Sequence, residues 1–155
     1  MKLYGLQMTR NLNNFLRESE HKQYAVQKGT DMHTKMQKIV VDSDCIIGDA
    51  DIVNIIKKRS DLVLFFNKNA KTEVSVAGYI SGTFISRRID RLFIDDKTKT
   101  VYFIDYKTDV NKTEFINKYK QQLNEYAQLL HSAYPDYKIN GYILWLNDWE
   151  LYKLI

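Results

Sequence analysis

The chain has 155 residues, of which 45% are hydrophobic and 27% charged, which suits one globular domain over residues 1–155. Its net charge of +4 is compatible with a polyanionic partner but is not evidence for one. Its apolar runs are too short to span a bilayer, and residues 1–10 lack the apolar stretch of a signal peptide, so we expect no membrane contact. The single cysteine, Cys45, excludes an internal disulfide and an iron–sulfur cluster or zinc site held by cysteines of this chain alone, which favours a cytoplasmic location.

The first part of the chain has little apolar periodicity. Residues 1–28 are polar, and we expect a short helix or an ordered arm there. The pair Gly29-Thr30 predicts a helix start with Thr30 as the N-cap residue. Apolar residues then recur at helical spacing, namely Met32, Met36, Ile39 and Val40. His33 lies one turn from Met36 and therefore borders the expected buried side.

Two further short segments precede the sheet. Residues 51–59 are expected to form a helix, because isoleucines recur at helical spacing. Ser60-Asp61 resembles another N-cap, so residues 62–66 are expected to form a short helix, although their unbroken apolar run fits a strand equally well.

From Lys71 onward the apolar period changes to two. Residues 73–79 and 83–94 are predicted to form antiparallel strands joined near Ser81-Gly82, and residues 95–99 form a polar turn before a strand at 101–107. Residues 111–133 give the clearest helix, and Pro135 follows it. Two closing strands are expected at 141–146 and 151–155. The sequence therefore predicts an α/β fold with a mixed central β-sheet, an antiparallel meander and flanking helices.

The strand at 101–107 carries the first candidate chemistry. Strand side chains alternate between faces, so Asp105 and Lys107 point the same way. A divalent cation prefers carboxylate oxygens, and phosphoryl transfer benefits from a positive charge beside the metal. Asp90 could converge with Asp105 on one cation if their strands pair. The alternatives are a solvated Asp105–Lys107 pair and a surface ion pair between Asp90 and Arg88 or Arg91.

Four blocks of residues carry a family resemblance. They are Gly29-Thr30-Asp31-Met32-His33, Arg88-Ile89-Asp90-Arg91, Asp105-Tyr106-Lys107-Thr108 and Tyr119-x-x-Gln122-Leu123-x-x-Tyr126. In this order they resemble motifs of the PD-(D/E)XK nuclease superfamily, most closely the RecB/AddA-type nuclease domain. One departure is Arg87, which stands where that family often has glycine before its Arg-Ile-Asp-Arg segment.

The resemblance implies a restriction-endonuclease-like core over residues 29–155 and a metal-dependent deoxyribonuclease, with exonuclease activity favoured over endonuclease activity. It implies Mg²⁺, for which Mn²⁺ can substitute, held by His33, Asp90 and Asp105. Lys107 would position the attacking water and stabilise charge on the phosphate. Tyr119, Gln122 and Tyr126 would contact the phosphate backbone of DNA. Glu73 occupies a place that is often acidic in the family and is a second-tier candidate.

Each of these residues also has a structural interpretation. His33 could be a hydrogen-bonded core histidine, Lys107 a solvated strand-end lysine and Glu73 an exposed strand-end charge. Gln122 and Tyr126 lie four residues apart and could form a polar packing stripe beside the core. Lys112, Lys118 and Lys120 add positive charge on or beside the same helix.

The resemblance also bears on partners. No Gly-x-x-x-x-Gly-Lys-Ser/Thr motif occurs, so we expect that the chain is not an ATP-driven helicase by itself. We expect a stand-alone nuclease, a split subunit or an excised domain. A helicase subunit is a potential partner, in DNA repair or recombination. DNA would be bound without sequence preference. The alternatives are a catalytically inactive nucleic-acid-binding module with the same fold and a protein-interaction domain unrelated to DNA.

Overall fold

The computed structural model describes the backbone of residues 3–155 and the side chains of residues 17–23 and 26–155. The chain divides into two compact units, Met1–Thr34 and Lys35–Ile155, and each is described by itself. Within the described residues, no helix is both long and apolar enough to cross a membrane.

The N-terminal helix, α1, spans Leu3–Gln37. The predicted helix start at Gly29-Thr30 is therefore wrong, because both residues lie inside α1. Thr30 does not cap a helix; its hydroxyl donates to the Val26 carbonyl at 3.0 Å, one turn earlier in the same helix. Glutamate, lysine and arginine are good helix formers without apolar periodicity, which is why a search for that periodicity misses such a segment.

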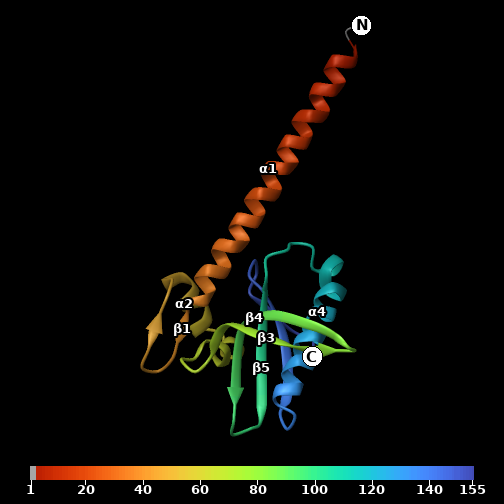
Figure 1. Cartoon of the computed structure of the whole chain (residues 1–155). Helices are drawn as coiled ribbons and strands as arrows, with labels where there is room; N and C mark the ends of the chain where they lie inside the picture. Colours follow the sequence, from red (N-terminus) through yellow and green to blue (C-terminus); the bar gives the residue numbers. More distant parts are fainter. Residues whose placement is uncertain (1–2) are drawn as a thin grey trace. The chain divides into compact units, whose positions relative to one another are not determined.

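A five-stranded sheet in the order β3-β4-β5-β6-β7 forms the centre of the second unit (Figure 1). The strands are β3 (Lys71–Ile80), β4 (Thr83–Asp95), β5 (Thr100–Lys107), β6 (Lys138–Trp145) and β7 (Glu150–Lys153). β3, β4 and β5 form an antiparallel meander, β5 and β6 are parallel, and β7 is antiparallel to β6. The predicted α/β fold with a mixed sheet and an antiparallel meander is thus confirmed.

Strand β4 is longer than its pairing with β5. The two strands pair from Asp95↔Thr100 to Arg91↔Ile104, and the rest of β4 pairs only with β3. Beyond Ile104, β5 continues beside β6 alone, up to the pair Lys107↔Trp145. The strands therefore diverge after Arg91, and residues 83–90 form the outer half of a β3–β4 hairpin. Its two-residue turn, Ser81-Gly82, has positive φ at both positions, as a tight hairpin turn requires.

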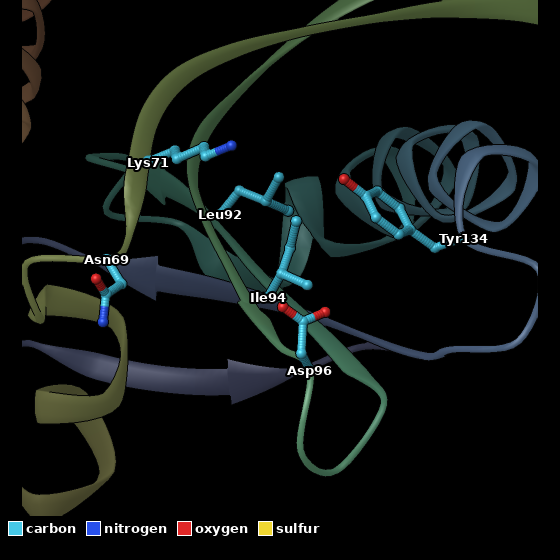
Figure 2. A pocket seen from close by; sticks show the side chains of 6 residues that line it. All are labelled: Asn69, Lys71, Leu92, Ile94, Asp96 and Tyr134. Carbon is cyan, nitrogen blue, oxygen red and sulfur yellow. The ribbon is translucent and has the colours of Figure 1, made fainter.

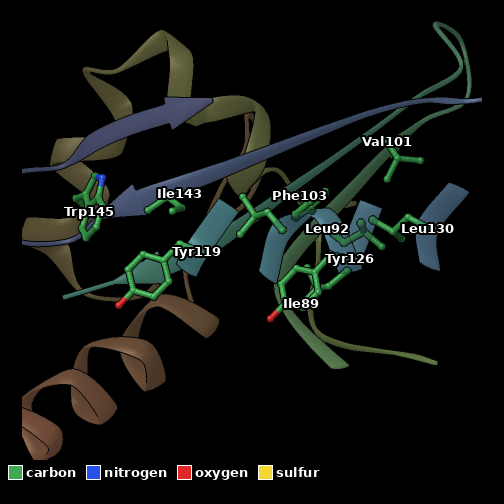
Figure 3. Close-up of a cluster of buried hydrophobic side chains, with 10 residues drawn as sticks. Ile89, Leu92, Val101, Phe103, Tyr119, Tyr126, Leu130, Ile143 and Trp145 are labelled. Carbon is green, nitrogen blue, oxygen red and sulfur yellow. The ribbon is translucent and has the colours of Figure 1, made fainter. Parts of the chain in front are cut away.

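Helix α4 (Lys112–Ala133) begins where the sequence predicts, because the Asn111 side chain accepts a hydrogen bond from the Glu114 N–H. Its apolar side packs on one face of the sheet and encloses the main core (Figure 3). The core contains Ile89, Leu92, Val101, Phe103, Tyr119, Leu123, Tyr126, Leu130, Ile143 and Trp145. Gly141 on β6 pairs with Phe103 on β5, and a Cβ at position 141 would collide with the Phe103 ring. Only glycine therefore lets that ring lie so close to β6.

The opposite face of the sheet is covered by shorter elements. They are α2 (Ala50–Lys57), α3 (Ser60–Val63), the 3-10 turn η1 (Leu64–Phe66) and the last residues of α1. Residues 62–66 are thus helical, as one of the two predictions for them has it. A small hairpin of β1 (Val40–Val41) and β2 (Ile46–Ile47) was not expected from the sequence.

Candidate functional site

Two carboxylates lie where β4 and β5 diverge. The last backbone pair between these strands is Arg91↔Ile104. Asp90 and Asp105 are the next residues beyond that pair, on β4 and β5 respectively. The Tyr106 N–H donates to Asp90 Oδ2 at 2.7 Å, so the Asp90 side chain occupies the gap between the strands. The two residues that could have paired with Asp90 have other partners: Arg88 pairs with Glu73, and Arg91 donates to carbonyls and to Tyr106. The sequence prediction that Asp90 and Asp105 converge is consistent with this geometry.

Asp105 is almost fully buried, with 3% of its surface exposed. Its Oδ1 atom accepts long hydrogen bonds from Gln122 Nε2 at 3.5 Å and from the Tyr126 hydroxyl at 3.4 Å. Its Oδ2 atom lies 2.5 Å from Lys107 Nζ, which makes an ion pair, but the angles do not make a hydrogen bond and no other donor reaches it in the described part of the chain. A buried carboxylate oxygen without a donor is costly, and such an atom calls for an explanation.

The charge of Asp90 is disfavoured by its surroundings. Burial and, next to it, the nearby Asp105 carboxylate raise the pKa of the Asp90 carboxyl from its usual 3.8 to about 7, although the Tyr106 N–H and Lys107 act in the opposite direction. Two carboxylates this close repel each other unless a positive charge lies between them. The pair is therefore suited to a cation that binds both.

Lys107 is held on three sides. Its ammonium contacts Asp105 Oδ2, donates to Gln122 Oε1 at 3.3 Å and lies 4.2 Å from the centre of the Tyr119 ring. Gln122 Nε2 in turn donates to the Tyr126 hydroxyl at 2.5 Å, and that hydroxyl donates to Asp105. The four side chains thus form a closed polar ring that fixes both the lysine and the carboxylate.

Tyr119 and Tyr126 insert their rings into the core, and Figure 3 shows their hydroxyl oxygens at its edge. The Tyr119 hydroxyl donates to Asp109 Oδ2, and its ring lies against Trp145. Burial and the neighbouring aspartates raise the pKa of both hydroxyls, so both stay protonated. The contacts that the structure shows for Tyr119, Gln122 and Tyr126 are with core and polar residues of this chain, and their predicted contact with DNA stays a prediction.

Glu73 lies on β3 close enough to Asp90 for its charge to raise the pKa of that carboxyl. Its side chain accepts a hydrogen bond from Gln37 Nε2 at 2.8 Å and pairs with Arg88 at 2.7 Å. Its φ of 53° is unusual for a residue with a side chain, and such strained conformations gather at functional sites. Glu73 thus borders the carboxylate pair.

His33 belongs to the Met1–Thr34 unit, whose placement relative to the second unit is not determined. Its predicted role as the third metal ligand therefore stays a prediction. Among the described residues, no group of three or more histidine, cysteine, aspartate or glutamate side chains is assembled that could hold a metal ion.

Two features of the site were missed from the sequence. Asp109, which holds the Tyr119 hydroxyl, gave no signal except its place just after the strand. Lys112, which was expected to add positive charge near a substrate, pairs with Asp148 and Glu150 and so fastens α4 to the β6–β7 turn. A lysine near one end of a helix cannot be told from a ligand-binding lysine by spacing alone.

The pocket in Figure 2 lies elsewhere. It is lined by Asn69, Lys71, Leu92, Ile94, Asp96 and Tyr134, none of which is a predicted site residue. Figure 2 shows two opposite charges, on Lys71 and Asp96, and apolar side chains between them.

Comparison of the chain with protein-family models finds no match, and neither does comparison with curated proteins. A function must therefore be inferred from the site residues and from the motifs that they form.

Proposed function

We propose that this chain is a metal-dependent deoxyribonuclease of the PD-(D/E)XK type, similar to the RecB/AddA nuclease domain. One observation carries the proposal. Asp90 and Asp105 form a carboxylate pair in the gap between β4 and β5, with a buried oxygen of Asp105 that lacks a hydrogen-bond donor and with Lys107 beside it. Such an arrangement is costly as a structural feature and useful as a cation site.

The residues present fit Mg²⁺, with Mn²⁺ as a substitute. The donors are hard carboxylate oxygens, and Mg²⁺ takes few of them because it retains several waters. Asp90 and Asp105 would hold the ion, and the resemblance adds His33. The bound ion would supply a positive charge that stabilises the negative charge on a phosphodiester.

The side chains of this chain would do the rest. The Lys107 ammonium is placed to stabilise negative charge on the phosphate and to orient the attacking water. Gln122, Tyr126 and Tyr119 would keep Lys107 and Asp105 in place, which matters because small errors of position are costly in catalysis. Water would add to phosphorus while the bond to the leaving oxygen breaks.

The finer assignment depends on the resemblance. It supports DNA bound without sequence preference, exonuclease rather than endonuclease activity, and a role in repair or recombination beside a helicase subunit. Contacts with phosphates would make the affinity fall with added salt.

A second function is favoured by one contact. The Lys107 ammonium already neutralises Asp105 at 2.5 Å, as it would in a nucleic-acid-binding module that has lost metal and turnover. Binding of DNA without metal-dependent cleavage would support that module.

Two measurements test the proposal. Linear and circular, single- and double-stranded DNA are incubated with and without Mg²⁺, and Mn²⁺ is titrated into the protein by calorimetry. We expect cleavage only with metal and heat of binding that disappears in the Asp90→Asn, Asp105→Asn double variant. Cleavage in excess chelator, or equal heat from the double variant, would remove the metal site.

A further inference from the structure

One face of the outer half of the β3–β4 hairpin is exposed among the residues that the structure describes. Side chains alternate along each strand, and one set packs toward α4: a Cβ at Gly78 would meet Leu129, and Arg87 pairs with Glu125. The other set is exposed at every position. It consists of the cross-strand pairs Ser75↔Arg88, Ala77↔Ser86 and Tyr79↔Phe84.

An aromatic pair ends this face. Tyr79 is 75% exposed and Phe84 is 60% exposed, and their ring centres lie 5.5 Å apart in an edge-to-face arrangement. This arrangement leaves ring surface open to solvent. Two large rings at the tip of a hairpin, exposed to this degree, are more than the strand pairing needs, since cross-strand pairs are satisfied by far smaller contacts.

The face leads from the rings to the candidate site. Small side chains on Ala77 and Ser86 leave a flat path, and Arg88 lies at the end near the carboxylates. The Arg88 side chain is 69% exposed although its Nε is bonded to Glu73, so N–H groups remain for a phosphate. Asp90 follows two residues later on the same strand.

The length of the path suits a few nucleotides. Asp90 lies six residues after Phe84, which is about 20 Å of extended strand. At about 3.4 Å per stacked nucleotide this distance holds about six nucleotides, and fewer if the strand is stretched. A base on the rings would therefore lie on the same strand of substrate as the phosphate at Asp90.

We infer that this hairpin face, defined by Ser75, Ala77, Tyr79, Phe84, Ser86 and Arg88, is a platform for unpaired nucleotides of the DNA substrate, with bases stacked on Tyr79 and Phe84 and a phosphate on Arg88. Stacking on aromatic rings is tolerant of sequence because every base has a π-face. The inference rests on the proposed function for the identity of the substrate. It makes single-stranded DNA, or a frayed end, the form that the hairpin guides to the carboxylates.

Binding is measured by fluorescence anisotropy with labelled oligothymidylate in chelator, where no metal-dependent cleavage occurs. We expect the Tyr79→Ser, Phe84→Ser variant to bind about tenfold or more weakly, since each stacked base contributes measurably to affinity. The Tyr79→Leu, Phe84→Leu variant keeps an apolar cross-strand pair without π-faces and should show the same loss with an unchanged melting temperature. Tyr79→Trp should bind as well as the original chain or better.

The matched control is Tyr152→Ser, because Tyr152 is also exposed, at 47%, but lies on β7 at the far edge of the sheet. It should leave the affinity unchanged. Equal affinity of the leucine variant and the original chain, or equal losses for the leucine and Tyr152 variants, would overturn the platform. A loss confined to the hairpin variants in a chain that never cleaves DNA would keep the platform and overturn the nuclease, so the two failures are distinguishable.

Discussion

The two faces of the sheet at β4 and β5 differ in how completely a buried charged side chain is hydrogen-bonded. On one face the Arg91 guanidinium, 1% exposed, donates to Tyr106, Phe65, Met36 and Ile39 oxygens at 2.7 to 3.3 Å and lies over the Phe66 ring. On the other face the buried Asp105 keeps one oxygen without a hydrogen-bond donor, beside a second carboxylate. Neighbouring positions of one sheet thus hold a buried cation whose three nitrogens all donate hydrogen bonds and a buried carboxylate with one oxygen that accepts none.

This difference suggests a structural role for Arg91 and a ligand-binding role for the aspartates. Arg91 binds carbonyls at the C-terminal end of α1, where unpaired oxygens and the helix dipole favour a cation, and it joins that end to η1 and β5. Its hydrogen-bond partners are all groups of this chain, so Arg91 stabilises the folded state. Asp105 instead has one buried oxygen that accepts no hydrogen bond and a second carboxylate nearby, which is expected of a group whose ligand comes from outside.

Asp105→Asn should have the largest effect. It removes the negative charge and keeps the shape, so cleavage in Mg²⁺ should fall on the order of 10³-fold, as for loss of a group that acts on transition-state charge. The unfolding free energy in chelator should change little, because the lost ion pair with Lys107 is offset by the lost repulsion with Asp90. Rates at saturating DNA and chemical denaturation of the same sample measure both. Retained cleavage would show that Asp105 is not a site residue.

Arg91→Met should act on the other face and in the other way. It leaves four oxygen acceptors without their buried cation, and we expect a loss of about 3–5 kcal/mol in unfolding free energy, the range for breaking a buried charged network. Arg88→Met, at an exposed position on the same strand, is the control and should change stability by about 0.5 kcal/mol or less. Equal effects of the two substitutions would refute the contrast between the faces.

The pH dependence of stability sharpens the comparison. The pKa of Asp90 is raised from 3.8 to about 7 in the folded chain, so the folded state keeps a proton that the unfolded chain has released between these values. The stability that Asp90 contributes is therefore complete below about pH 4 and is lost as pH rises through 7, with a total on the order of 4 kcal/mol.

Urea unfolding in chelator at several pH values tests this dependence. The original chain should lose stability relative to Asp90→Asn as pH rises from 4 to 8. A constant difference between the two proteins would mean that Asp90 is not held in a charge-disfavouring site.

The smallest expected effect concerns Tyr119. Its ring lies 4.2 Å from Lys107 Nζ, and such a contact contributes about 0.5–1 kcal/mol or more when shielded from water. Tyr119→Leu should lower the cleavage rate several-fold with little change in DNA affinity, whereas Tyr119→Phe keeps the ring and should retain most of the rate. A loss of affinity alone in both variants would instead assign Tyr119 to the substrate.

The sequence predicted the parts of this molecule that depend on local pattern. Period-two alternation located β3, β4 and β5, and the helical spacing of apolar residues over 111–133 located α4. The shared direction of Asp105 and Lys107 also follows from alternation, and their ion pair is consistent with it.

The rest depends on packing between distant segments. Where β4 leaves β5 is set by tertiary pairing, so the gap that holds Asp90 has no local signal. Arg91 is buried against carbonyls of residues up to 55 positions away in the sequence. The Arg-Ile-Asp-Arg segment that ends with Arg91 gives no local signal of those contacts. The length of α1 was missed because its polar residues favour a helix without forming an apolar side.

Gly141 on β6 gives the neighbouring strand β5 a further property. The Phe103 ring occupies space that a methyl group at position 141 would fill, and the same ring packs edge-on against Tyr126 at 5.9 Å. Tyr126 in turn donates to Asp105. The place of the Tyr126 hydroxyl beside Asp105 therefore depends on the space that the missing side chain at position 141 leaves for the Phe103 ring. A substitution at Gly141, which has no polar side chain, is thus expected to disturb the hydrogen bond to Asp105 through two packed rings.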